Sequence, residues 1–190
     1  MKTAKVISII CHPIFQPTWM FLLLTGDWRL TLIVFAMTCL IPGLVIVMMK
    51  RWKLISSLEM EDRDDRPGAL FVLLMFLYAT IRFFSRLHIP PFFNFYLTSV
   101  LLVTALAFVI SFFWKISLHS LGWGNLAACL FVMTTMSMRM YLPHFIASIL
   151  LTGIVLAARL KLKSHSNAQI YSGLAVGFST VIIMYFILLV

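Results

Sequence analysis

The chain has 190 residues, of which 62% are hydrophobic and 11% are charged, and its formal net charge is +9. This balance excludes a soluble domain, and several apolar runs approach the roughly 20 residues that cross a bilayer. The sequence therefore predicts an all-α, polytopic membrane bundle of six or seven transmembrane helices, with residues 1–190 forming a single domain.

The first apolar segment, residues 1–26, follows Lys2 and Lys5 and contains Pro13 and Pro17. Each proline removes a backbone donor, so this segment is either a kinked span or a re-entrant, interfacial one. No small-residue cleavage site follows it, and we expect it to stay on the mature protein. The sequence leaves the choice between the two topologies open.

Six further apolar runs follow, and the middle four form two pairs that separate three polar islands. The expected spans are residues 28–49, 68–86, 95–113, 123–138, 142–158 and 170–190. The islands are residues 50–66, 114–122 and 159–169. Because two spans lie between consecutive islands, all three islands are expected on one side of the membrane, where they can meet at one site.

The third island places Arg159, His165 and Gln169 between two long apolar runs. Polar residues this close to hydrocarbon are functional candidates by default. His165 and Gln169 are four residues apart and share a face of a helix, so the amide can hold one ring nitrogen and leave the other for chemistry. The guanidinium of Arg159 suits phosphate. The alternative, membrane-flanking cations with a capping residue, stays open.

The acidic residues are few, and none follows Asp65. A mechanism that needs carboxylates from two distant helices, as in most two-metal phosphotransferases, is therefore excluded. Two histidines with several arginines suit phosphoryl transfer through a phospho-histidine, in which arginines neutralise the phosphate oxygens. We expect no metal, no cofactor and no nucleic acid, and the positive charge favours a lipid phosphate or an anionic lipid head group.

Three short motifs resemble those of the type 2 phosphatidic acid phosphatase superfamily, membrane lipid phosphatases related to the vanadium haloperoxidases. That family carries Lys-x6-Arg-Pro, Pro-Ser-Gly-His and Ser-Arg-x5-His-x3-Asp. This chain has Arg66-Pro67, then Ile116-Ser117-Leu118-His119, then Ala158-Arg159-x5-His165-x3-Gln169. The resemblance covers about residues 59–177.

The resemblance implies a role for each matching residue. His165 is the expected nucleophile, His119 the general acid and Gln169 the residue that orients His165. Phosphate ligands are expected at Arg66, Arg159 and Ser117. The family lysine falls on Glu59, which repels phosphate, so Arg63 or Lys115 is expected to supply that cation. Leu118 replaces the glycine that approaches phosphate, and Gln169 replaces an aspartate, so the imidazolium loses a negative partner.

The resemblance implies a metal-independent lipid-phosphate phosphatase or phosphotransferase, acting on a prenyl, phosphatidyl or lipid A-type phosphate. The alternative is a catalytically inactive membrane protein of the same fold that binds a lipid or a partner. We expect a multi-pass protein of the bacterial inner membrane. The positive-inside rule places the islands in the cytoplasm if the first segment spans, whereas bacterial members of the family usually work on the periplasmic face.

Other polar residues favour structural interpretations. The histidines beside prolines are expected to be structural; these are His12, His88 and His144. Lys161 and Lys163 are expected to anchor to head groups. The acidic segment 59–65 alternates with arginine and is expected to be a solvated, self-paired loop.

Overall fold

The computed structural model of the protein describes residues 2–58, 60, 62–136 and 139–189, so Glu59 lies outside the described residues. The described chain contains helices and no strand. Six helices are long and apolar enough to cross a membrane. The predicted all-α, multi-pass membrane bundle is therefore confirmed.

The chain divides into two compact units. One unit is Ile14–Trp114, and the other combines Met1–Pro13 with Lys115–Val190. The single domain expected from the sequence stays a prediction.

The unit Ile14–Trp114 contains five α-helices and a short π-helical turn among its described residues. They are α2 (Gln16–Thr25), α3 (Trp28–Phe35), η2 (Ala36–Leu40), α4 (Ile41–Arg51), α5 (Arg66–Phe84) and α6 (Pro91–Ser111). Asp27 caps α3 by accepting hydrogen bonds from the backbone of Arg29 and Leu30, at 2.8 and 3.2 Å. The helix α3 continues through η2 into α4, and together they form one candidate span. The widened turn precedes Pro42, which has no N–H to donate to the preceding turn.

Aromatic rings form the core of this unit. Phe21 from α2 meets Phe84 from α5 at 5.5 Å and Phe93 from α6 at 4.6 Å between ring centroids. All three side chains are fully buried. Phe21 meets Phe93 edge to face and Phe84 at a tilt, and aromatic pairs of this kind contribute about 0.5–1.5 kcal/mol each beyond the area they bury.

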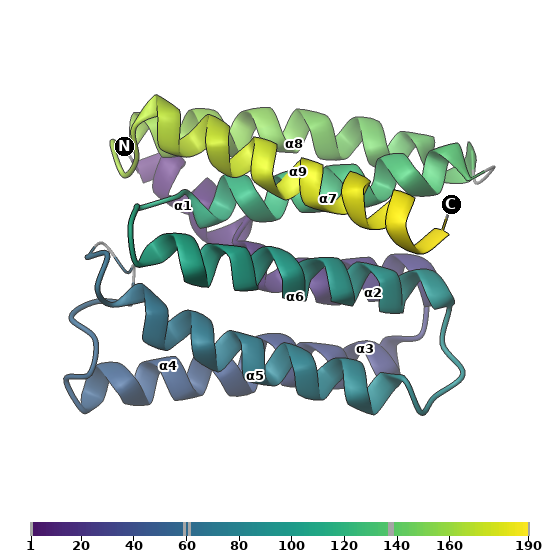
Figure 1. Ribbon diagram of the computed structural model, residues 1–190, viewed down its shortest axis with the longest axis horizontal. Helices are drawn as coiled ribbons and strands as arrows, with labels where there is room; N and C mark the ends of the chain where they lie inside the picture. Colours follow the sequence, from purple (N-terminus) through teal and green to yellow (C-terminus); the bar gives the residue numbers. More distant parts are fainter. Residues whose placement is uncertain (1, 59, 61, 137–138, 190) are drawn as a thin grey trace. The chain divides into compact units, whose positions relative to one another are not determined.

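The other unit contains α1 (Lys2–Ile10), α7 (Leu118–Thr135), the short η3 (Arg139–Tyr141), α8 (Leu142–Lys161) and α9 (Asn167–Leu189). The last three α-helices lie side by side, with α7 in contact with both α8 and α9 (Figure 1). Most of α7 is buried, and it is not among the six helices that satisfy the criteria for a span. Because its neighbours shield it from lipid, α7 can carry buried polar residues such as Asn125.

Glycines let α7 and α9 approach closely. A Cβ added at Gly177 would collide with the carbonyl oxygen of Leu121, and one added at Gly173 would lie 2.8 Å from the carbonyl oxygen of Ser117. Gly124 plays the matching part on α7, against the backbone of Leu174. Small residues at such a contact allow two membrane helices to pack backbone to backbone.

The helix boundaries bear on the expected spans in two places. The first segment is interrupted at its prolines, as expected, since η1 (Pro13–Phe15) separates α1 from α2. The second polar island is not entirely a loop, because α7 begins at Leu118 and includes His119. Residue 138, the expected end of this span, lies outside the described part of the chain.

Candidate functional site

The second and third polar islands meet at one end of the unit that contains α7, α8 and α9. The backbone N–H of Ser117, just before α7, donates a 3.2 Å hydrogen bond to the carbonyl oxygen of Gln169, in the first turn of α9. Arg159 lies in the last turn of α8. The expected meeting of these two islands is thus found, and it places two helix N-termini beside the end of a third helix.

His165 and Gln169 are in contact, as their spacing predicts. The ring Nδ1 of His165 lies 3.2 Å from Oε1 of Gln169. The same Oε1 accepts a 3.1 Å hydrogen bond from the backbone N–H of Ser166, and this donor requires an oxygen at that end of the amide. An oxygen acceptor places the proton of His165 on Nδ1, so Nε2 carries the lone pair.

Gln169 also belongs to a helix cap, which the alternative interpretation of the third island includes without naming the residues. Ser166 caps α9: its hydroxyl accepts a 3.3 Å hydrogen bond from the backbone N–H of Gln169, while the Gln169 side chain returns to the N–H of Ser166. This reciprocal pair is a capping box, whose Ser-x-x-Gln signature stands in the sequence. The cap fixes the amide in space and thereby fixes the ring of His165.

Ser117 occupies the N-cap of α7. Its hydroxyl oxygen accepts hydrogen bonds from the backbone and the side chain of Ser120, at 3.4 and 3.0 Å, and both serines are fully buried. The residue expected as a phosphate ligand is therefore engaged as a helix cap. Its position still holds the first turn of α7, and with it His119, at the end of the bundle where α9 begins.

Ser8 on α1 joins His119 to Arg159. The Nε2 atom of His119 lies 3.0 Å from the carbonyl oxygen of Ser8 and 3.3 Å from its hydroxyl. A guanidinium nitrogen of Arg159 donates a 2.9 Å hydrogen bond to that hydroxyl. Because a carbonyl can only accept, the proton of His119 is assigned to Nε2. Ser8 and His119 are buried.

The end of α1 adds a second histidine ring to this cluster. The ring of His12 meets the ring of His119 edge to face, with 4.8 Å between the centroids. The indole N–H of Trp123 donates a 2.9 Å hydrogen bond to the carbonyl oxygen of Cys11, which anchors the chain just before His12. Sequence reasoning assigned His12 a structural role and did not single out Ser8. No motif marks either residue, and the neighbouring Pro13 was the only signal.

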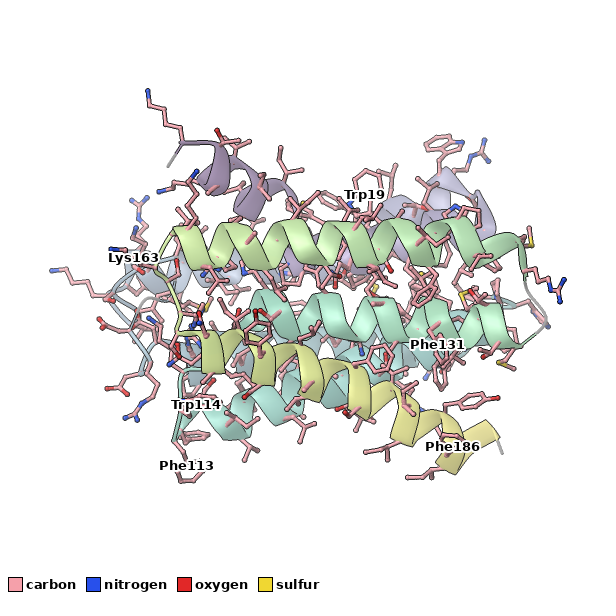
Figure 2. The ribbon with its side chains drawn as sticks, turned by 90° about the horizontal axis from the view of Figure 1, so that it is seen from above. Trp19, Phe113, Trp114, Phe131, Lys163 and Phe186 are labelled. Carbon is pink, nitrogen blue, oxygen red and sulfur yellow. The ribbon has the colours of Figure 1, made fainter. Side chains whose placement is uncertain are left out.

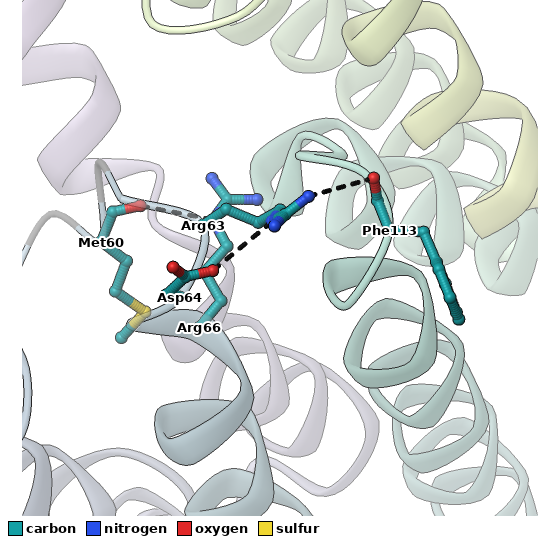
Figure 3. Close-up of polar contacts among 5 residues, drawn as sticks. All are labelled: Met60, Arg63, Asp64, Arg66 and Phe113. Atoms are coloured by element: carbon teal, nitrogen blue, oxygen red, sulfur yellow. Dashed lines mark hydrogen bonds and ion pairs between the residues drawn. The ribbon is translucent and has the colours of Figure 1, made fainter.

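The first polar island belongs to the unit Ile14–Trp114 and makes its own contacts there (Figure 3). Arg66, the first residue of α5, is buried and donates a 3.3 Å hydrogen bond from Nε to the carbonyl oxygen of Met60. Arg63 donates to the carbonyl oxygen of Phe113 at 3.4 Å and lies 3.5 Å from the carboxylate of Asp64.

The expected phosphate-binding roles of Arg63 and Arg66 remain predictions. Lys115 lies in the other unit, half-buried in the segment before α7. Its expected role also remains a prediction. Lys163, expected as a head-group anchor, projects from the turn between α8 and α9 (Figure 2).

One acidic residue of the first island departs from the expected solvated loop. The Asp65 carboxylate is buried and accepts hydrogen bonds from the backbone and hydroxyl of Ser56, the shortest at 2.6 Å, and from the backbone of Ser57 at 3.2 Å. Burial raises the pKa of this carboxyl, but these hydrogen bonds outweigh burial, so its pKa is lowered from the ordinary value. Asp65 thus organises the segment that precedes α5.

The cluster has the chemistry of an anion site. It combines the guanidinium of Arg159 and the Nε2–H donor of His119 with the positive ends of α7 and α9, and the lone pair on Nε2 of His165 adds a nucleophile. His119 lies within electrostatic range of both Arg159 and His165. Among the described residues, no three His, Cys, Asp or Glu side chains gather closely enough to hold a metal ion.

Comparison of the chain with protein-family models, with curated proteins and with solved structures finds no match. The residues and the geometry of this chain are therefore the basis for a proposed function.

Proposed function

We propose that the cluster formed by α1, α7, α8 and α9 binds the phosphate group of a membrane lipid and removes or transfers it through a phospho-histidine. The observation that carries the proposal is that Arg159 and the Nε2–H of His119 both contact Ser8, an arrangement called here the Ser8 bridge. Two donors are thereby directed at the same small region. The neighbouring pair of His165 and Gln169 adds a nucleophile whose tautomer is fixed. The likeness of the three motifs to those of the type 2 phosphatidic acid phosphatases supports the same chemistry.

In the proposed reaction, Nε2 of His165 attacks phosphorus and the bond from phosphorus to the lipid oxygen breaks. His119 acts as the acid in its imidazolium form: once the phosphate has displaced the contact with Ser8, the leaving oxygen takes the Nε2 proton, and His119 becomes neutral with its remaining proton on Nδ1. Water then attacks the phospho-histidine, His119 takes a proton from this water, and inorganic phosphate leaves. In a phosphotransferase, an acceptor hydroxyl replaces water. Arg159 and the ends of α7 and α9 stabilise the charge on the phosphate oxygens.

The proposed substrate is a prenyl, phosphatidyl or lipid A-type phosphate in the bacterial inner membrane. A lipid phosphate suits the cluster because the cluster lies at the end of helices long and apolar enough to cross a bilayer. Lys161 and Lys163 extend the positive charge at this end of α8 and suit anionic head groups.

Two observations favour the alternative of a binding protein without turnover. Arg159 and His119 already bond to Ser8, so the protein itself satisfies groups that a phosphate would use. Gln169 is also neutral and engaged in a helix cap, so it offers His165 a hydrogen bond but no negative charge. A lipid head group could then be held without bond cleavage.

The test is a phosphate-release screen over a panel of lipid phosphates, run in chelator beside the His165→Ala protein. His88→Ala is the matched control, because His88 is exposed and lies in the other unit. We expect release by the wild type and by His88→Ala, and a loss of about 10³-fold or more in His165→Ala. Lipid binding without release, unchanged by His165→Ala, would establish the binding protein instead.

A further inference from the structure

An apolar groove runs along the unit that contains α7, α8 and α9. Its volume is about 520 Å³, within the range of ~300–1,000 Å³ typical of ligand sites. One wall is α8, with Gly153 and Leu156, the other is α9, with Ala175 and Phe178, and Ala127 of α7 lies between them. Three helices therefore form the groove, and α7, which lies between α8 and α9, is the most buried of them.

The close contact between α7 and α9 leaves this space beside α8. The glycines of α9 draw it onto α7, whereas a Cβ added at Gly153 of α8 would meet nothing within 4 Å. Tyr171 and Ala175, which line the groove on α9, are exposed. Because α8 and α9 are long and apolar enough to cross a bilayer, we expect hydrocarbon beside the groove, and the ligand class that matches its lining is a hydrocarbon chain.

One end of the groove lies at the anion cluster. On α8, Thr152 and Leu156 line the groove and Arg159 follows at the next position of the same helix face. Three residues separate Leu156 from Arg159, a rise of about 4.5 Å along a helix. On α9, Tyr171 follows Gln169 by two residues, a rise of about 3 Å. A phosphate at the cluster would place its first methylene groups at the mouth of the groove.

The groove extends past the middle of α8. Its lining on α8 runs from Phe145 to Leu156, a rise of about 16 Å, and Phe145 lies 14 residues from Arg159, a rise of about 21 Å. At the deep end the ring of Phe131 packs against Phe145 and Phe178, with centroid distances of 5.6 and 6.3 Å (Figure 2). A chain that starts at the cluster and fills the groove would therefore pass the middle of a bilayer core about 30 Å thick.

We propose that this groove is the subsite for the hydrocarbon chain of a lipid monophosphate, with the phosphate at Arg159. The inference rests on the proposed function for the identity of the head group. It adds that one chain binds between α8 and α9, and that this contact selects long-chain over short-chain phosphates. Charge complementarity between the phosphate and Arg159 sets the orientation of the lipid in the groove.

The experiment uses the full chain in nanodiscs, with hexadecyl phosphate that carries a photoreactive diazirine near the end of its chain. Cross-linked peptides are mapped by mass spectrometry. Because the diazirine would lie at the deep end of the groove, we expect labelling of α8 around Phe145 and of α9 around Phe178, and less labelling at Leu156 and Tyr171 near the mouth. Gly153→Phe fills the groove from a position with open space, and we expect it to lower this labelling by ~10-fold or more. Gly43→Phe is the matched control, since Gly43 lies in α4 and also has no atom within 4 Å.

Ala175→Phe, from the opposite wall, provides a second test if Gly153→Phe does not yield folded protein. Hexadecanol with the same diazirine tests the contribution of the phosphate. We expect hexadecanol to label the wild type more weakly than hexadecyl phosphate does. We expect hexadecyl phosphate to label Arg159→Gln as weakly as hexadecanol labels the wild type. Equal labelling by the phosphate and the alcohol would mean that ordinary bilayer hydrocarbon fills the groove, and would overturn the proposal. Labelling that both groove variants leave unchanged would overturn it as well.

Turnover separates the two proposals. If the protein is a phosphatase, Gly153→Phe should lower the release of phosphate from hexadecyl phosphate by ~10-fold while butyl phosphate is hydrolysed as by the wild type. If no phosphate is released but labelling still depends on the head group and on Gly153, the groove is a lipid-binding site and the phosphatase function fails alone.

Discussion

The Nε2 atom of His119 lies 3.0 Å from the carbonyl oxygen of Ser8, a residue 111 positions earlier in the chain. The hydroxyl of the same serine accepts a hydrogen bond from Arg159. The N-terminal helix α1 thus contributes a side chain and a backbone oxygen to a cluster that otherwise comes from the C-terminal half of the sequence. If the cluster binds phosphate, α1 is a part of the site and not only a membrane anchor.

Ser8→Ala tests whether the bridge positions Arg159. The substitution removes the hydroxyl but keeps the carbonyl that His119 contacts, so we expect kcat/KM for a lipid phosphate to fall by about 10-fold, as for one hydrogen bond to a charged group. Ser148→Ala is the control, because Ser148 is also buried but bonds only within α8, to Phe145. A higher rate in Ser8→Ala would mean instead that Ser8 competes with phosphate for Arg159.

Gln169 substitutions test whether the site uses a charged imidazolium. Gln169→Glu keeps the capping box and adds a negative charge beside His165, so we expect the rate of phosphate release to stay the same or rise. Gln169→Asp carries the same charge and should act alike, whereas Gln169→Leu should lower the rate by removing the orienting bond. If the site only binds an anion, a new carboxylate should weaken binding, which a lipid-binding assay measures.

Ser166→Ala separates the cap from the orientation of His165. It removes the hydroxyl that accepts from the backbone of Gln169 and should cost the folded state about 1 kcal/mol, as the loss of a helix N-cap usually does. The contact between His165 and the Gln169 side chain can persist, so activity should change less than in Gln169→Leu. A catalytic protein indifferent to every substitution of Gln169 would contradict the orienting role.

Much of the fold is predictable because the apolar runs are long and the polar islands are short. The pair of His165 and Gln169 was predictable for the same local reason, since helical periodicity brings residues four apart together. Counting spans predicted only that the second and third islands lie on the same side of the membrane, whereas the hydrogen bond between Ser117 and Gln169 depends on the packing of α7 against α9. The Ser-x-x-Gln signature of the capping box is also present in the sequence, and the alternative interpretation of the third island included a capping residue without naming this pair.

The Ser8 bridge and the start of α7 could not be obtained in this way. Ser8 meets Arg159 across 151 residues, and no local pattern records a contact between α1 and α8. The expected span after the second island begins at residue 123 because the island is polar, yet α7 begins at Leu118 with Ser117 as its cap, since its polar first turn is buried by neighbouring helices. Asp65 was likewise expected in a solvated loop, because nothing in a run of acidic residues indicates which carboxylate is buried and accepts hydrogen bonds from Ser56.

Gly177→Ala tests the backbone contact between α7 and α9. The added methyl group would collide with the carbonyl oxygen of Leu121, and we expect the free energy of unfolding to fall by about 1–3 kcal/mol. Gly153→Ala is the matched control on α8, where the methyl meets open space and should stabilise the helix by up to ~1 kcal/mol. Thermal unfolding in detergent measures both, and equal stability of the two variants would contradict the close contact.

Asp65 provides a prediction of pH dependence outside the membrane spans. Its pKa is lowered in the folded protein from an ordinary value of 3.8, since hydrogen bonds from Ser56 and Ser57 to the charged form outweigh burial. A lowered carboxyl pKa stabilises the folded state above the ordinary value, and this stabilisation is lost as pH falls through the folded pKa.

Asp65→Asn removes the titrating group and should therefore lower the stability of the segment before α5 at neutral pH by about 1–3 kcal/mol. Below the folded pKa, wild-type Asp65 is itself neutral, so the difference between the two proteins should shrink there. Limited proteolysis of the segment between α4 and α5 at several pH values measures this difference. Asp62→Asn is the control, because its carboxylate makes only an exposed 3.3 Å contact with Ser56 and should leave the protection unchanged. A gap between wild type and Asp65→Asn that persists in acid would mean that the amide disturbs the packing of the segment and that the carboxylate charge is not the source of its stability.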